Sequence, residues 1–216
     1  MENTRPGYIY FASESVGEGH PDKLCDQVSD GILDQCIRQD KHCKVGLETA
    51  TKTKMVCMLG ETLVDGPAIN YEQIAREVCK KVGYDDENKG LDYKTMSVLV
   101  NVERQSPEIA AAVHVSKDMD DFGAGDQGIM FGYATDEWDS ETLHPYSHWL
   151  SNKLCEEMAK ARHSGAIPWL RPDCKSQVVV EYANEHGKLR PVRIYNILIS
   201  TPVSYTHLRA HETEAD

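Results

Sequence analysis

The order of elements constrains the fold of this chain more than any other feature, because a helix followed by a β-hairpin occurs twice. The first helix is predicted to begin at Pro21, since proline suits a first turn and apolar residues recur at helical spacing from Leu24 to Ile37. Two β-like runs follow, at residues 44–51 and 54–64, and are expected to pair as a hairpin. This order predicts an α/β (α+β) fold in which helices cover sheets.

A second helix and a buried strand complete this first group of elements. Asn70 is a typical N-cap and Gly83 a typical stop for a helix between them, and residues 95–102 form an apolar run typical of a buried strand. The polar stretch after that strand lacks periodicity, which predicts a mobile functional loop at residues 105–128. The apolar face of the second helix consists of Ile74, Val78 and Val82.

The second group repeats the helix and the hairpin. A helix is predicted around residues 146–163 with Gly165 as its stop, and strands at residues 175–183 and 189–200 flank the turn sequence NEHGK. Residues 202–216 continue no apolar period. We therefore treat them as a non-native tail and exclude them from the fold.

Composition excludes several classes of protein. The chain has 35 acidic and 23 basic residues, a net charge of −12, and no basic patch, so nucleic acid and anionic membranes are not expected as partners. Its seven cysteines form no C-x-x-C pair or zinc spacing, as in a reduced protein. No basic leader precedes an apolar run, and no run approaches the about 18 apolar residues of a membrane span. These features predict a cytoplasmic protein.

Residues 11–23 concentrate groups that suit polyphosphate chemistry. Glu14, Glu18, His20, Asp22 and Lys23 surround two glycines just before a helix N-terminus, where free amides favour anions. Carboxylates suit magnesium, and a histidine can donate to an oxygen that gains charge. The alternative is a capped helix preceded by a solvated acidic loop, and spacing alone favours that alternative.

Two common nucleotide-binding motifs are not supported. Gly123, Gly125 and Gly128 satisfy G-x-G-x-x-G, but a polar segment, SKDMDDF, precedes them instead of an apolar strand. The run IMFGYATDE after them favours a strand over a helix, which argues against a Rossmann oxidoreductase. A P-loop kinase is also disfavoured, because the chain contains no G-x-x-x-x-G-K-[ST].

Several segments together carry a family resemblance. FASESVGEGHPDK at residues 11–23 resembles the N-terminal motif of S-adenosylmethionine synthetases, and GAGDQGIMFGYATDE at residues 123–137 resembles their first signature. The resemblance covers nearly all of residues 8–201. Further similar segments are GETL at Gly60, GYDD at Gly83, QSPEIA at Gln105 and PWLRPDCKSQV at Pro168.

The resemblance implies a fold, a reaction and partners. Members have three similar α/β domains, of which the last is incomplete or absent here. It implies a discontinuous N-terminal domain at residues 1–18 plus 137–201 and a central domain at residues 19–108. The implied reaction joins ATP and L-methionine into S-adenosylmethionine and cleaves the released triphosphate to phosphate and diphosphate. Mg²⁺ and K⁺ are the implied ions, and a homodimer or tetramer with active sites at the subunit interface is the implied assembly.

The resemblance also assigns residues to the ATP side of the site. His20, Lys175 and Asp126 are the implied catalytic residues, with His20 near the ribose 5′ oxygen and triphosphate. His20, Asp173, Cys174 and Lys175 are the implied ATP-binding residues. No basic activator lies beside Cys174 in sequence, so a nucleophilic role for its thiol is not expected.

The remaining implied residues concern methionine and metals. Glu61 and Gln105 match residues that hold methionine, Glu14 and Asp22 match magnesium ligands, and Glu48 matches a residue associated with potassium. For Glu48 the alternative is an exposed strand acid, and Glu61 and Gln105 could be ordinary surface residues.

A hypothesis of a different class is a catalytically incompetent relative that only binds full-length subunits. The later family segment GGGAFSGKD, which supplies lysines and a metal-binding aspartate, is not found in these 216 residues. Each well-placed charge facing a triphosphate leaving group contributes about 3 kcal/mol. We therefore expect the 216 residues alone to have little or no activity.

Overall fold

The computed structural model describes residues 7–104, 120 and 128–202, and its packing separates the chain into two compact units. Residues 1–23 and 133–216 form one unit, called the split unit because two distant stretches of chain build it. Residues 24–132 form the other, called the continuous unit. The domain limits predicted from sequence stay predictions. None of the helices in the described ranges combines the length and the apolar character that a membrane span requires.

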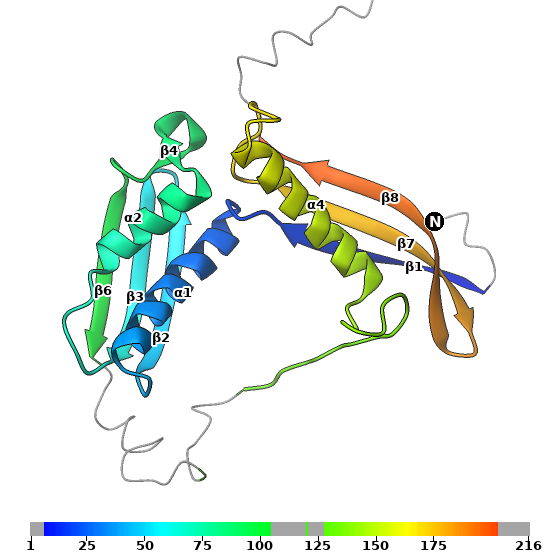
Figure 1. Ribbon diagram of the computed structural model, residues 1–216, viewed down its shortest axis with the longest axis horizontal. Coiled ribbons are helices and arrows are strands. Elements are labelled where there is room, and N and C mark those ends of the chain that lie inside the picture. Colours follow the sequence, from blue (N-terminus) through cyan, green and yellow to red (C-terminus); the bar gives the residue numbers. More distant parts are fainter. Residues whose placement is uncertain (1–6, 105–119, 121–127, 203–216) are drawn as a thin grey trace, which may run out of the picture. The chain divides into compact units, whose positions relative to one another are not determined.

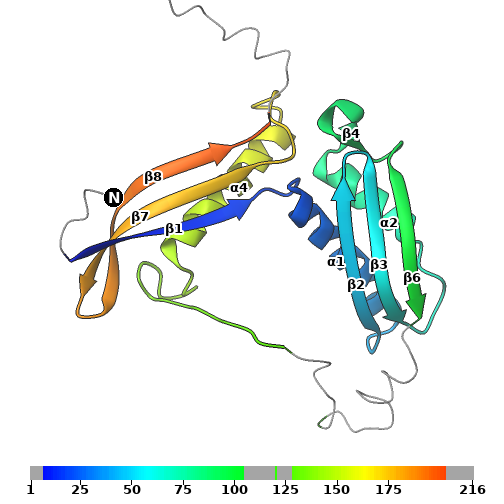
Figure 2. The same cartoon turned by 180° about the vertical axis from the view of Figure 1, so that it is seen from behind.

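The split unit is a three-stranded antiparallel sheet with one covering helix. Its strand order is β1 (Tyr8–Val16), β7 (Lys175–Glu185) and β8 (Lys188–Ser200). Helix α4 (Tyr146–His163) lies across one face of the sheet (Figure 1), whereas Figure 2 shows the opposite face. Strand β1 pairs antiparallel with β7, and Phe11 lies opposite Val180. The first described strand is thus built into a sheet whose other strands follow 150 residues later or more.

Alternation along β7 creates the core of this unit. Val178, Val180 and Tyr182 point to the same face, as expected for a period of two, and their exposed fractions are 0, 0 and 2%. Apolar side chains of α4 and β8 pack against them. These partners are Tyr146, Leu150, Leu154 and Leu189.

The continuous unit also has a helix-covered, three-stranded sheet. Its strand order is β2 (Lys44–Lys52), β3 (Met55–Leu63) and β6 (Ser97–Arg104), with the first pair antiparallel and the second parallel. Helix α1 (Pro21–Gln39), from residue 24 onward, and helix α2 (Tyr71–Val82) cover one face (Figure 1). The hairpin is confirmed. The parallel pair was not predicted, and it arises because α2 forms the crossover from β3 to β6.

A short ribbon lies between α2 and β6. Strand β4 (Asp85–Asp86) pairs antiparallel with β5 (Leu91–Asp92) across the 3-10 helix η1 (Glu87–Lys89). These short elements are not among those predicted from the sequence.

The core of the continuous unit lies between its helices and its sheet. Leu24, Val28, Ile32 and Cys36 recur every four residues along α1 and are fully or almost fully buried. They form one cluster with apolar residues of α2 and β3. On α2, Ala75, Cys79 and Val82 are buried, while the predicted face residues Ile74 and Val78 pack only partly buried against the cluster.

The helix ends have identifiable caps. Asn70 Oδ1 accepts the backbone N–H of Gln73 at 3.0 Å, and Gly83 ends α2 with φ +97°, so both predicted caps are confirmed. Helix α4 lacks a side-chain cap at its own N-cap residue. Instead, Glu137 Oε1 accepts the N–H of Tyr146 at 2.6 Å and the Tyr182 hydroxyl at 3.1 Å, which ties the start of α4 to β7.

The structure also differs from the sequence expectations at β1 and at residues 129–137. Strand β1 was not predicted, since its residues belong to a motif analysed only for its chemistry. The run at residues 129–137 was expected to favour a strand, but it forms neither strand nor helix. Ile129, Met130 and Phe131 are 81, 95 and 93% exposed, so no described neighbour completes a ladder there. The predicted loop at 105–128 lies outside the described residues except for 120 and 128, as does the tail beyond 202.

Candidate active site

The loop between β1 and α1 lies directly against the segment that precedes β7. The N–H of Gly17 donates to the Cys174 carbonyl at 2.8 Å, and the N–H of His20 donates to the Gly17 carbonyl at 3.0 Å. A Cβ on Gly17 would collide with the Cys174 thiol, and one on Gly19 would collide with the Pro172 backbone. Glycine is thus required at both positions for close approach. The fold brings together two motifs that the sequence keeps about 150 residues apart.

His20 is held with one ring nitrogen committed to the backbone. Its side chain is 15% exposed, and its Nδ1 accepts the backbone N–H of Asp22 at 3.2 Å. A neutral ring that accepts through Nδ1 carries its proton on Nε2. His20 therefore presents an Nε2–H donor. The Asp22 carboxylate is 92% exposed, with Oδ2 3.9 Å from Nδ1 of His20.

Asp173 carries a carboxylate oxygen that lacks a partner in the described part of the chain. Its Oδ1 is buried and makes no hydrogen bond within the described residues. Burial raises the pKa of this carboxyl, while the neighbouring charges of His20 and Lys175 act to lower it. Buried acceptors without partners are costly and uncommon, so this oxygen is suited to a donor from a ligand.

Lys175 adds a cation beside Asp173. Its side chain is exposed and makes no hydrogen bond or ion pair with the part of the chain that the structure describes. His20, Asp173 and Lys175 together offer an N–H donor, an unpartnered acceptor and an ammonium. That set can bind a polyanion that also carries hydroxyl donors.

Cys174 is a packing residue of this site. Its exposed fraction is 5%, and its thiol contacts Gly17 on one side. A hydrogen bond with Cys155 and burial both raise the pKa of Cys174, so its thiol is poorly suited to nucleophilic attack. Cys155 in turn donates to the Ser176 hydroxyl at 3.3 Å.

Glu18 makes contacts that the sequence analysis did not anticipate. Its Oε1 accepts from Nη2 of Arg162, and lies 2.6 Å from Nε2 of His163. Arg162 and His163 stand in the last turn of α4, where basic residues favour the negative end of the helix dipole. That position was the only sequence signal for them, and it does not identify Glu18 as their partner.

The remaining predicted acids do not form a metal centre on their own. Within the described ranges there is no group of three or more His, Cys, Asp or Glu side chains that could hold a metal ion. Glu14 is exposed on β1, and its Oε1 accepts from Nε2 of Gln177 at 3.4 Å. Gln105 and Asp126 lie outside the described residues.

Glu48 and Glu61 belong to the continuous unit and share one face of its sheet. Glu48 pairs with Leu59 and Glu61 with Gly46, and residues two apart on a strand point the same way. The opposite face carries the buried residues Val56 and Met58. Both acids therefore lie on the face that α1 and α2 do not cover.

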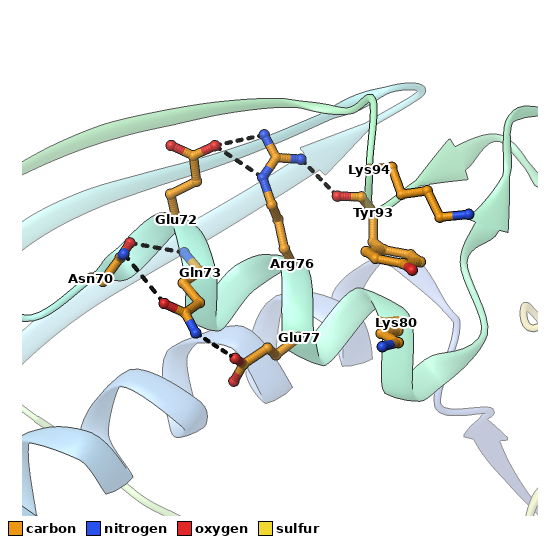
Figure 3. A pocket seen from close by; sticks show the side chains of 8 residues that line it. All are labelled: Asn70, Glu72, Gln73, Arg76, Glu77, Lys80, Tyr93 and Lys94. Atoms are coloured by element: carbon orange, nitrogen blue, oxygen red, sulfur yellow. Dashed lines mark hydrogen bonds and ion pairs between the residues drawn. The ribbon is translucent and has the colours of Figure 1, made fainter.

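A hollow on the continuous unit is a separate feature. It has a volume of about 430 Å³ and lies between α2 and the turn before β6, and Figure 3 labels the eight side chains that line it. The Nζ atoms of Lys80 and Lys94 lie 5.6 and 5.3 Å from the centre of the Tyr93 ring.

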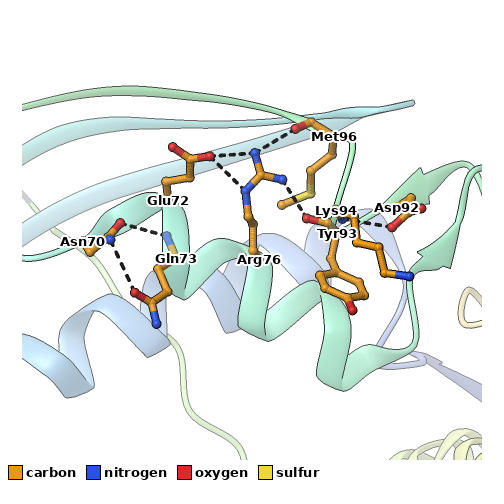
Figure 4. Close-up of polar contacts among 8 residues, drawn as sticks. All are labelled: Asn70, Glu72, Gln73, Arg76, Asp92, Tyr93, Lys94 and Met96. Atoms are coloured by element: carbon orange, nitrogen blue, oxygen red, sulfur yellow. Dashed lines mark hydrogen bonds and ion pairs between the residues drawn. The ribbon is translucent and has the colours of Figure 1, made fainter.

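Arg76 lines this hollow, and its guanidinium is hydrogen-bonded to other groups of the protein (Figure 4). Nε and Nη2 donate to Glu72 Oε1 at 2.9 and 2.7 Å. Nη1 donates to the Tyr93 carbonyl at 2.7 Å, and Nη2 donates to the Met96 carbonyl at 3.2 Å. Arg76 therefore ties α2 to the turn before β6. Because these hydrogen bonds are made within the protein, we interpret the hollow as a structural feature and not as a ligand site.

Comparison with known protein families agrees with the motifs. Residues 8–107 match the family model described as S-adenosylmethionine synthetase, N-terminal domain. Residues 121–215 match the model described as S-adenosylmethionine synthetase, central domain. The two family models match consecutive stretches of the sequence, whereas the split unit and the continuous unit are defined by which residues pack together.

Proposed function

Because the chain belongs to the S-adenosylmethionine synthetase family, we propose that its split unit forms the ATP side of a methionine adenosyltransferase site. The carrying observation is that the β1–α1 loop and the segment before β7 bring His20, Asp173 and Lys175 together, with Asp173 Oδ1 unpartnered among the described residues. An unsatisfied acceptor beside two cationic or donor groups suits a nucleotide better than it suits a purely structural contact.

The proposed reaction is one displacement followed by a hydrolysis. Methionine sulfur attacks the 5′ carbon of ATP, the bond from that carbon to oxygen breaks, and triphosphate leaves with the electron pair. Water then cleaves triphosphate to diphosphate and phosphate. Both steps build negative charge on phosphate oxygens, so donors placed where that charge develops lower the barrier.

Each residue of the split unit has a distinct proposed role. His20 donates its Nε2–H to the departing 5′ oxygen or the adjacent phosphate. Lys175 neutralises phosphate as a point charge, since an exposed ammonium on a strand end can follow a moving group. Asp173 accepts a hydrogen bond from the nucleoside, and the Cys174 backbone holds the β1–α1 loop in place.

The chain's donors fit magnesium that arrives with ATP. Mg²⁺ in nucleotide sites is typically held by one or two carboxylates together with phosphate oxygens and water. The exposed carboxylate of Asp22 suits that role, and Glu14 is the second proposed ligand. When bound, the ion would offset charge on the triphosphate. Glu48 is the proposed acid near K⁺.

The proposed methionine-binding roles rest on the family resemblance. Glu61 is proposed to meet the methionine ammonium and Gln105 to hold the amino acid, while Asp126 is proposed as an acid near the nucleoside. We propose a cytoplasmic homodimer or tetramer whose sites form at the subunit interface.

The experiment compares ATP binding by the wild-type chain and by His20→Asn. Calorimetric titration with ATP and Mg²⁺ should give weaker binding for His20→Asn than for wild type. His186→Asn is the matched control, because His186 is exposed in the β7–β8 turn at φ +56°, a conformation that asparagine tolerates. Where S-adenosylmethionine formation can be measured, losing this donor should slow it about 100-fold or more. Equal rates for His20→Asn and wild type would remove the role of His20.

A second candidate is a non-catalytic partner of full-length subunits. Large apolar side chains on β8 support it, because Ile194, Ile197, Leu198 and Ile199 are 42 to 57% exposed. This candidate predicts co-purification with full-length subunits without added turnover. Product formation by the chain itself would contradict it.

A further inference from the structure

We infer that Glu18, Arg162 and His163 form a clamp that positions the β1–α1 loop, and through it the ring of His20. The inference rests on the proposed ATP site. The three residues are proposed to position that site without contacting the substrate. The clamp joins residues 144 and 145 positions apart in sequence, within the split unit.

The burial of these groups distinguishes the clamp from surface ion pairs. The Arg162 side chain is 11% exposed and that of Glu18 is 29% exposed. Along the same helix, the pair Lys160–Glu157 is 57 and 64% exposed. Exposed pairs contribute little because water screens them and both side chains lose freedom. A shielded, charge-assisted pair holds a more defined geometry.

The position of Glu18 gives the clamp its effect on His20. Glu18 stands between Gly17 and Gly19, which have no side chains that could anchor the loop. The backbone of Gly17 is bonded to Cys174 on one side and to the His20 N–H on the other. The Glu18 carboxylate is therefore a side-chain anchor in a turn that ends at His20, and releasing it should let the turn move.

The charge of the clamp also favours the proposed ligand. A carboxylate two residues from His20 would repel triphosphate if it stood alone. Arg162 cancels that charge within the protein. An interaction with the dipole of α4 would explain basic residues in its last turn, but it would not require a carboxylate from another segment.

The test follows the ring of His20 by NMR in the full chain labelled at histidine. The His20 signal is identified by its loss in His20→Asn. Arg162→Gln and Glu18→Gln should shift or broaden this signal, and Arg162→Lys should restore part of the wild-type position. Lys160→Gln is the matched control, because it removes a cation from the same end of α4 without contact to Glu18.

A second measurement is calorimetric titration with inorganic triphosphate and Mg²⁺. Arg162→Gln should bind it about tenfold more weakly than wild type, since a charge-assisted contact that orders the donor is lost. An unchanged His20 signal in both Arg162→Gln and Glu18→Gln overturns the clamp. If Arg162→Gln does not fold, the His20 signals of Glu18→Gln and Arg162→Lys test the clamp instead.

The two proposals can fail separately. If wild type binds no triphosphate, or His20→Asn binds it as tightly as wild type, the proposed function fails while the NMR signal still decides the clamp. If His20→Asn loses binding but Arg162→Gln keeps both binding and the His20 signal, only the clamp fails.

Discussion

The loop around His20 and the hollow beside α2 differ in how their polar groups are satisfied. At the hollow, the Arg76 guanidinium donates to Glu72 and to two backbone carbonyls. At the loop, among the described residues, Asp173 Oδ1 is buried without a partner and the Lys175 side chain makes no hydrogen bond or ion pair. The hollow is a concave surface of about 430 Å³, yet the loop holds the groups that lack partners among the described residues. We therefore place the proposed site at the loop, since a buried acceptor without a partner suits a ligand better than concave shape alone does.

The largest effect is expected for Gly19→Ala, which attacks the loop directly. The new methyl group would overlap the Pro172 backbone, which cannot yield as a flexible side chain could. We expect a loss of about 3 kcal/mol in stability or, if the loop moves instead, loss of ATP binding. Urea denaturation and calorimetric titration measure the two outcomes. Gly132→Ala is the control, because its Cβ would meet nothing within 4 Å. A variant with wild-type stability and affinity would show that the loop does not depend on this packing.

Arg76→Ala tests whether the hollow is structural. It leaves two backbone carbonyls and Glu72 without their donor, so stability should fall by about 2 kcal/mol. Affinity for ATP in the folded protein should not change. Denaturation together with ATP titration checks both statements. If affinity fell while stability stayed at the wild-type value, the hollow would be a ligand site.

Asp173→Asn should raise stability and weaken ATP binding, whereas Arg76→Ala should lower stability and leave ATP binding unchanged. The pKa of Asp173 is raised above its ordinary value of 3.8 by burial, so the folded state holds the proton more tightly than the unfolded state does. Stability should therefore decline as pH rises from about 3.8 through the raised pKa.

Asparagine cannot ionise, so Asp173→Asn removes the cost of a buried negative charge. At neutral pH, Asp173→Asn should be more stable by about 1 kcal/mol, and the gain should vanish below the ordinary pKa of the carboxyl. Its ATP affinity should fall. Thermal denaturation from pH 3 to 8 measures the difference. A variant less stable than wild type at neutral pH would mean that Asp173 has a stabilising partner.

The smallest effect is expected for Lys80→Ala beside the hollow. Lys80 lies near the Tyr93 ring but forms none of the hydrogen bonds drawn in Figure 3. Stability should change by less than about 0.5 kcal/mol, as for surface substitutions generally, and ATP affinity should stay the same. Urea denaturation and ATP titration of Lys80→Ala and Arg76→Ala, measured side by side, compare the two variants. A large loss of ATP affinity would transfer the site to the hollow.

The sequence predicted most of the regular structure because the relevant patterns are local. Apolar residues every four positions define α1, Asn70 and Gly83 define the ends of α2, and the two hairpins need only nearby strands. The family was also identifiable from short motifs, and the family comparison confirms it. The roles of individual site residues stay predictions.

The sequence by itself determined the helices, the hairpins, the family and the residue types that suit phosphate chemistry. Only the tertiary structure decided that β1 pairs with β7, that Gly19 lies against Pro172, and that Glu18 meets Arg162. Helix periods and caps depend on residues within one or two turns, so a sequence displays them directly. Contacts across more than a hundred residues depend on which apolar faces pack together, and no local pattern encodes that choice.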